Sequence, residues 1–245
     1  MTEEQIQKIR YYAACDIAHR WFAFFEGKTE EIKQHLDIFS KDIMLVHGGT
    51  HLLASGKEAM SHRLHNLPSE KGSHFIREIR ICQNRDEAEM DMDIGYQAVR
   101  PDGKVGGALS EYRTTVSFDK QHNATFRWIQ KTPLMPNPDK IFRDSFAENR
   151  IRSFIARFAQ VTLLSSFPEQ KALLGDVVDA TSGVRLSSEL KKMKVMNIHV
   201  ESLNTMTHSC SLLLAERSSS VRRRLDLVLA DGDGRYTAIK TASFN

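Results

Sequence analysis

The chain has 245 residues, a formal net charge of +3, 41% hydrophobic residues and 27% charged residues. These values are ordinary for a globular protein, and no apolar run approaches the ~18 residues that a membrane helix needs. The charge is too small and too evenly spread for a nucleic-acid-binding surface. Residues 1–10 lack the basic and apolar regions of a secretory signal. We therefore expect a cytoplasmic protein that binds neither a membrane nor nucleic acid.

Cysteine and histidine usage argues against a metal site. Cys15, Cys82 and Cys210 are odd in number and scattered, so they predict reduced core thiols and not a disulfide framework or a zinc site. Four histidines (His47, His51, His62 and His65) lie close together in the sequence but form no H-E-x-x-H motif. No phosphate loop or dinucleotide fingerprint is present. We expect neither a metal nor a cofactor.

Residues 3–26 are predicted to form a long helix that begins after Thr2 and stops at Gly27. Its apolar residues cover about half of its circumference, which indicates more burial than a surface helix would have. They are Ile6, Ala13, Ala14, Ile17, Ala18, Trp21, Phe22, Phe24 and Phe25.

A polar stripe flanks this apolar surface. Tyr12, Asp16 and His19 recur at i, i+4 and i+7, so they lie on one side of the helix. These residue types could serve proton transfer in a pocket. Alternatively, the stripe is simply the solvated side of the helix.

Two short helices and one strand follow. A helix is expected at about 29–36, a strand at 42–47 and a helix at 57–67 that ends before Pro68. On the strand, Ile43, Leu45 and His47 share one face. His47 is therefore a candidate for a pocket, with a hydrogen-bonded core or rim histidine as the alternative.

Residues 74–132 are predicted to form a four-strand antiparallel meander, because β-branched and aromatic runs alternate with turn formers. In the second run, Met90, Met92, Ile94 and Tyr96 share one face, whereas Glu89, Asp91 and Asp93 lie on the other. One face is therefore apolar and must be buried, and the long helix is the available partner. Cross-strand charge pairing explains the acidic face.

The remainder repeats this order of elements in a shorter form. Residues 133–141 are proline-containing and are predicted to be a linker between a domain at 1–132 and a second domain at 142–245. The second domain is predicted to contain a helix at 142–164, a short helical turn at 167–174, a turn-rich region at 175–184, two strands and a hairpin. The hairpin is expected to turn at residues 231–234.

The long helix, the phrase SGKEAM at Ser55–Met60 and the final strand with Trp128 and Ile129 together resemble the nuclear transport factor 2-like (NTF2-like) superfamily. The resemblance is greatest to its SnoaL-like polyketide cyclase and ketosteroid isomerase branch. It implies an α+β, cystatin-like fold in which a curved antiparallel sheet wraps over a helix and leaves an apolar pocket. Two tandem copies would give an intrachain pseudo-dimer, and a homodimer is also compatible with it.

The resemblance also implies site residues in the first copy. Enzymes of the family use a carboxylate or histidine as base and a tyrosine as hydrogen-bond donor, so the candidates are His47, Asp16, His19 and Tyr12. The residues expected to line the pocket are Trp21, Met92, Tyr96, Tyr112 and Trp128.

Three function classes remain open. The first is a protein that holds a small apolar molecule in the first cone. The second is a cofactor-independent isomerase, dehydratase or cyclase that acts there, and the third is a non-catalytic interaction scaffold.

Overall fold

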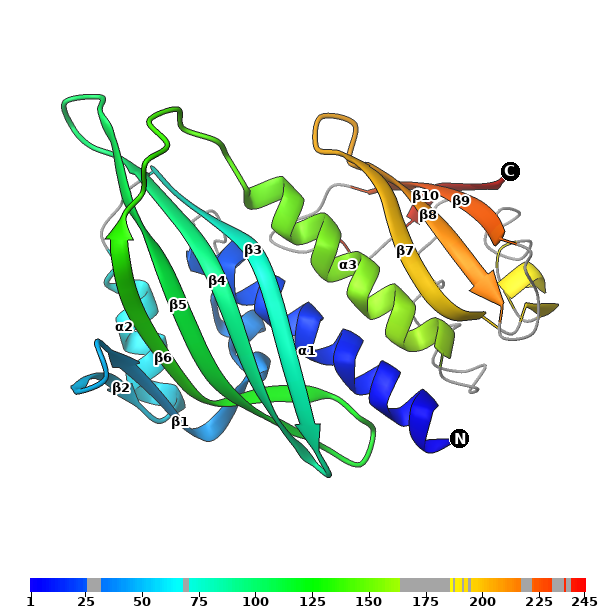
Figure 1. Cartoon of the computed structure of the whole chain (residues 1–245), viewed down its shortest axis with the longest axis horizontal. Helices are drawn as coiled ribbons and strands as arrows, with labels where there is room; N and C mark the ends of the chain where they lie inside the picture. Colours follow the sequence, from blue (N-terminus) through cyan, green and yellow to red (C-terminus); the bar gives the residue numbers. More distant parts are fainter. Residues whose placement is uncertain are drawn as a thin grey trace.

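The structure is a computed structural model, and it describes residues 1–25, 32–67, 71–163, 186, 188–190, 192–193, 195–216, 222–230, 236 and 239–245. Within this part of the chain the strands form two separate sheets, and two long helices lie side by side between them (Figure 1). The predicted elements at 167–174 and 175–184 and the turn at 231–234 lie outside the described residues.

The first sheet has the order β2-β1-β6-β5-β4-β3 within the described chain, and its pairs are antiparallel except for β1 with β6, which is parallel. The meander predicted at 74–132 is present as β3 to β6. The sequence did not suggest β2. The strands are β1 (Phe39–His47), β2 (His51–Ser55), β3 (Lys71–Asn84), β4 (Glu87–Val99), β5 (Val105–Phe118) and β6 (Ala124–Pro136).

The two faces of this sheet differ as the strand alternation predicted. Met90, Met92 and Ile94 of β4 are buried in the core. On the opposite face Asp93 accepts two hydrogen bonds from the Arg80 guanidinium of β3, at 2.9 and 3.0 Å. The apolar face is therefore the inner one, and charge pairing occupies the outer one.

Helix α1 (Glu3–Phe25) covers the inner face and is enclosed on all sides over much of its length. Every residue from 13 to 23 is buried, which is not possible for a helix with one solvated side. The 3-10 helix η1 (Ile32–Ile38) and α2 (Lys57–His65) close the rest of the sheet.

The second part of the chain places helix α3 (Phe146–Leu163) against a sheet with the order β10-β9-β8-β7 among its described strands. Its core is separate from the first and includes Phe154, Phe158, Leu212 and Tyr236. The strands are β7 (Val195–Asn204), β8 (Ser209–Glu216), β9 (Arg222–Leu229) and β10 (Ile239–Phe244).

The connection between the two parts begins later than predicted, because β6 extends to Pro136 and pairs with β5 up to that residue. β1 ends opposite Lys131, so the last residues of β6 have a neighbour on one side only, where proline is tolerated. The following segment then crosses the ends of β4 and β3. The Gln97 amide donates to the Ile141 carbonyl, and the Ser145 hydroxyl exchanges hydrogen bonds with the main chain of His74.

The polar stripe of α1 faces α3 and not solvent. The Ser153 hydroxyl donates to the Asp16 carboxylate, and His19 Nδ1 lies 3.0 Å from the Asn149 side-chain oxygen. Tyr12 reaches further and bonds the main chain of Ile198 on β7. The alternative of a solvated stripe was therefore wrong. The two parts of the chain pack through α1 and α3 (Figure 1).

We expect Tyr12→Phe to loosen this contact. The Tyr12 hydroxyl lies 3.3 Å from both the nitrogen and the carbonyl oxygen of Ile198, on a strand at the edge of its sheet. Losing these bonds should lower the free energy of unfolding by about 1 kcal/mol, measured by urea denaturation. Tyr11→Phe is the matched control, because Tyr11 is the exposed neighbour on the same helix. Equal effects of the two substitutions would contradict the role of the Tyr12 hydroxyl.

We expect burial of His19 to make stability depend on pH. Burial lowers the pKa of His19 from 6.5 to about 4, so the unfolded chain takes up this proton at a higher pH than the folded chain does. The free energy of unfolding should fall as pH drops through the range from 6.5 to 4, by about 2 kcal/mol for this residue between pH 7 and pH 5. In His19→Gln the decrease between those two pH values should be smaller by this amount. An identical decrease in the variant and the wild type would refute the assignment.

Candidate functional site

The middle of the first cone is filled by side chains. Trp21, Met92 and Tyr112, which were predicted to line a pocket, are fully buried in the core. Trp21 packs edge-on against Phe39, with ring centroids 5.4 Å apart. These three residues therefore form a packed interior.

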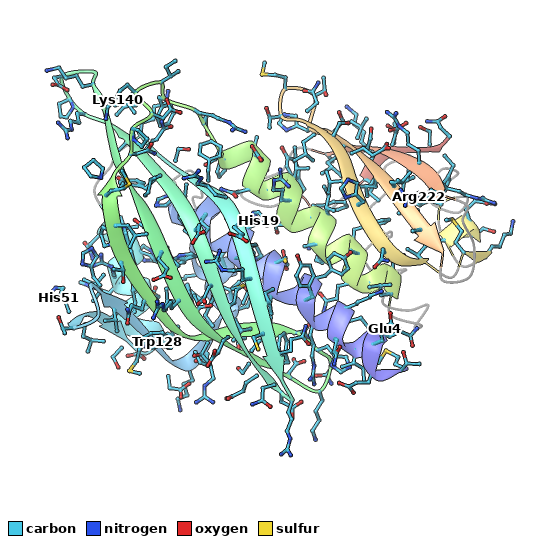
Figure 2. The ribbon with its side chains drawn as sticks, viewed as in Figure 1. Glu4, His19, His51, Trp128, Lys140 and Arg222 are labelled. Carbon is cyan, nitrogen blue, oxygen red and sulfur yellow. The ribbon has the colours of Figure 1, made fainter. Side chains whose placement is uncertain are left out.

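Trp128 lies on the other face of the sheet. Its strand neighbour Ile129 is fully buried and points inward, so Trp128 points outward, where its cross-strand neighbours are Met44 and Thr115. Figure 2 shows Trp128 and His51 on the side of the molecule away from α3. The structure therefore does not bring Trp128 together with Trp21, Met92 and Tyr112.

A stack of rings leads from α1 to the open end of the sheet. Phe22 of α1 stacks on His74 of β3 at a centroid distance of 5.3 Å, and His74 stacks on Tyr96 of β4 at 4.7 Å. His74 and Tyr96 are direct cross-strand partners, which explains why their rings meet. Tyr96 is only partly buried, so it marks the point where the packed interior ends.

Two further residues join this stack from β5 and β6. Tyr112 meets Phe22 edge-on, with ring centroids 5.3 Å apart, and its cross-strand partner is Lys131. The Lys131 ammonium lies 5.3 Å from the centre of the Tyr96 ring, a cation–π contact. Tyr96 therefore has an imidazole and an ammonium as neighbours.

Tyr96 also lines a cavity of about 450 Å³ at the open end of the sheet. Ala98 of β4 and its cross-strand partner Gly106 of β5 supply a part of the cavity wall that carries no large side chain. The Arg100 guanidinium lies over Gly106 and the Tyr96 ring lies close to Gly72, so these two side chains bound the cavity. The lining residues are Lys71, Tyr96, Ala98, Val99, Arg100, Pro101, Gly106 and Gly107.

Gly107 is required for this shape. Its φ of +144° is rarely adopted by other residues, and a Cβ atom there would come within 2.0 Å of the Tyr96 carbonyl oxygen. Only glycine therefore allows β5 to approach β4 beside Tyr96. The Asn137 side chain adds a hydrogen bond to the same carbonyl at 3.0 Å, which holds the Tyr96 backbone from the connecting segment.

Burial and like charges perturb the titrating groups of this end of the sheet. Burial, reinforced by the Lys131 charge, lowers the pKa of His74 to about 3, so this imidazole is neutral at pH 7. Partial burial and the nearby Arg63 charge lower the pKa of Lys131. Burial raises the pKa of Tyr112, which keeps this phenol protonated. The group is thus a neutral imidazole, a phenol and a destabilised ammonium.

The predicted catalytic residues divide between two places. Tyr12, Asp16 and His19 are held in the contact of α1 with α3 and β7, and Figure 2 shows His19 on the α3 side of α1. His47 lies at the end of β1, where the register places it beside Lys131. Of the predicted residues, Tyr96 is the one that lines the cavity.

A second cavity, of about 610 Å³, lies between α1, α3 and the turn from β5 to β6. Asp16 lines it, as do Arg20, Asp37, Asp119 and Arg157. Each of these charged groups already has a partner within the chain; Arg20 and Asp37, for example, form a two-point ion pair. The charged groups of this polar cleft are already engaged within the chain, which makes it the weaker candidate for a ligand site.

Sequence reasoning did not find His74, Lys131, Lys71 or Arg100. A signal for His74 existed, because the predicted pairing of the first two runs could have placed it opposite Tyr96. Trp128 was predicted to face inward. Lys131, on the opposite face of the same strand, was therefore not expected near the pocket. Lys71 and Arg100 lay outside the predicted strands.

No group of three or more metal-binding side chains occurs among the residues that the structure describes. Within the same residues, no helix is both long and apolar enough to cross a membrane.

Comparisons with known proteins find relatives only at the level of structure. No family model matches the sequence, and no curated protein matches it. Among the solved structures, a candidate aromatic ring hydroxylase from Novosphingobium aromaticivorans has a TM-score of 0.45 and 17% identity, covering 51% of this chain and 88% of that one. A candidate scytalone dehydratase from the same organism has a TM-score of 0.44 and 15% identity, covering 59% and 95%.

A third structure, described as an NTF2-like protein with a cystatin-like fold from the same organism, has a TM-score of 0.41 and 14% identity, covering 52% and 80%. Likenesses of this size concern the path of the chain and carry no information about chemistry. The predicted α+β fold class is confirmed, whereas a second full copy of the fold stays a prediction. Among the described residues, the first part of this chain is an α+β fold in which a six-stranded sheet covers the long helix α1.

Proposed function

We propose that this chain is a binding protein for a small molecule, which it holds in the cavity over Tyr96 at the open end of the first sheet. The observation that carries the proposal is the cavity of about 450 Å³ beside the filled core, with Ala98 and Gly106 in its wall. This volume is within the usual range for small-molecule sites.

The cavity favours ligand binding over a pure scaffold. An interaction scaffold needs no preformed hollow of this size. Here the close approach at Gly107 and the Asn137 hydrogen bond both hold the Tyr96 backbone in place. A preformed wall lowers the entropic cost of binding.

Catalysis by the predicted proton shuttle is less well supported. Asp16 and His19 are hydrogen-bonded to Ser153 and Asn149 across the contact of α1 with α3, so their polar atoms serve packing. His47 lies on β1, away from both of them. No pair of groups with opposed acid and base roles converges on the cavity from the predicted set.

We expect Ala98→Trp to abolish binding of a flat hydrophobic probe, because the indole would occupy the floor of the cavity. The measurement is fluorescence titration with phenylnaphthylamine, an uncharged probe. Wild-type protein should bind it, and Ala98→Trp should weaken binding by at least about tenfold, equivalent to roughly 1.4 kcal/mol.

Glu89→Trp is the matched control, since Glu89 is an exposed residue on the outer face of the same strand. It should bind the probe as the wild type does. Near-ultraviolet circular dichroism should show that both variants keep their packed cores. Unchanged binding by a folded Ala98→Trp variant would eliminate this cavity as the site.

A further inference from the structure

We propose that His47 and His51 form a binding site for a divalent transition-metal ion at the tip of the hairpin between β1 and β2. The site is separate from the cavity beside Tyr96, so the inference does not depend on the proposed function. Three observations support it: the register of the two strands, the availability of the two imidazoles, and the direction of the neighbouring ammonium group.

The first observation is the register of the hairpin. His47 and His51 are direct cross-strand partners in the antiparallel pair of β1 and β2. Side chains of such partners lie on the same face of the sheet, with Cβ atoms about 5 Å apart. Since an imidazole nitrogen binds a metal ion at about 2 Å, two rings with this spacing can converge on one ion.

The turn of the hairpin holds this register. Only Gly48, Gly49 and Thr50 separate the two histidines, and the glycines have φ angles of +61° and +84°, which favour glycine. The Gly48 nitrogen donates a hydrogen bond to the Lys131 carbonyl of β6 at 2.9 Å. The backbone therefore fixes the pair before an ion binds, which lowers the entropic cost of binding.

The second observation is that both imidazoles are available. Within the described part of the chain, no hydrogen bond, ion pair or ring contact engages the side chain of His47 or His51. His51 is exposed at the margin of the molecule (Figure 2) and His47 is partly buried, so an ion can reach the pair from solvent. Five other histidines have partners in the chain, namely His19, His65, His74, His122 and His208.

The third observation concerns charge. Lys131 is the neighbour of His47 on β6, and an ammonium group directed at the histidines would repel a cation. The Lys131 ammonium instead lies 5.3 Å from the centre of the Tyr96 ring on β4. Since β6 lies between β1 and β4 in the sheet, the ammonium is directed away from β1 and from the histidine pair.

The two ligands set the class of metal. Imidazole nitrogen suits Zn²⁺, Ni²⁺ and Cu²⁺, whereas Mg²⁺ and Ca²⁺ prefer oxygen ligands. Among the described residues no group of three metal-binding side chains occurs, so water or a ligand from solution would complete the coordination.

No metal was expected from the sequence, because the histidines lack an H-E-x-x-H motif. His47 and His51 are four residues apart, as the histidines of that helical motif are, but here a three-residue turn brings them together.

The test is isothermal titration of the full chain, without a histidine tag, with Ni²⁺ at neutral pH. The wild type should bind the ion. His47→Gln and His51→Gln should each weaken binding by at least about tenfold, because the second imidazole of the pair acts at a high effective concentration. Mg²⁺ should not bind to the pair. Near-ultraviolet circular dichroism should show that both variants keep their packed cores.

His62→Gln is the matched control. His62 is an exposed histidine on α2, and His65 lies three residues further along the same helix, so these two are the alternative histidine pair. His62→Gln should bind Ni²⁺ as the wild type does. As a second readout, the electron paramagnetic resonance spectrum of bound Cu²⁺ should show coupling to two imidazole nitrogens in the wild type and to one in His51→Gln.

The outcomes separate this inference from the proposed function. Unchanged Ni²⁺ affinity in a folded His47→Gln or His51→Gln variant would overturn the assignment, and so would an equal loss in His62→Gln. Absence of Ni²⁺ binding to the wild type would also overturn it. The cavity beside Tyr96 is tested separately, by the titration with phenylnaphthylamine.

Discussion

The whole structure depends on the burial of α1 from two directions. An antiparallel sheet with one apolar face needs a cover, and α1 provides it for the first sheet. The opposite side of α1 carries Asp16 and His19, which could not be left buried without partners, and α3 supplies them through Ser153 and Asn149. The second part of the chain thus covers the side of α1 that the first sheet leaves open, so α1 packs against both parts.

The position of the cavity follows from this arrangement. Phe22 is held on the inner side of α1, and the stack that it begins passes through His74 to Tyr96. Asn149 of α3 donates to the carbonyl of the same His74, so the second part of the chain also holds the strand that carries the stack. Tyr96 therefore lies on a wall fixed by both helices, although its own side chain reaches the open end. In such a site the backbone that carries Tyr96 is fixed before a ligand binds, whereas the side chains at the open end can adjust.

Much of the fold could be predicted because it is local. Strand alternation in 87–99 identified the inner face, and the 3.6-residue period identified α1 and its unusual burial. What failed depended on contacts between distant segments. The sequence pattern of Tyr12, Asp16 and His19 is the same whether water or another helix covers these residues. Residues 133–136 were predicted to belong to a linker, but they continue β6 because β5 pairs with them.

The candidate site was harder to predict than the fold for the same reason. Tyr96 was found because its strand alternates clearly. Lys131 contacts it from β6 and His74 from β3, and neither position has a motif around it. The hollow itself lies beside Ala98 and Gly106 on two neighbouring strands, and an alanine and a glycine several residues apart form no recognisable pattern in a sequence.

The shared role of α1 has a consequence for how the protein is made. The 120 residues between Phe25 and Phe146 separate the end of α1 from the start of α3. At ordinary rates of translation, roughly 6 to 24 seconds pass before α3 follows α1 out of the ribosome. During that interval the first sheet can close over one side of α1 while the other side, with its carboxylate and imidazole, stays hydrated. Those polar groups make the uncovered side of α1 less apolar in the unfinished chain, and the same residues join the two parts in the finished protein.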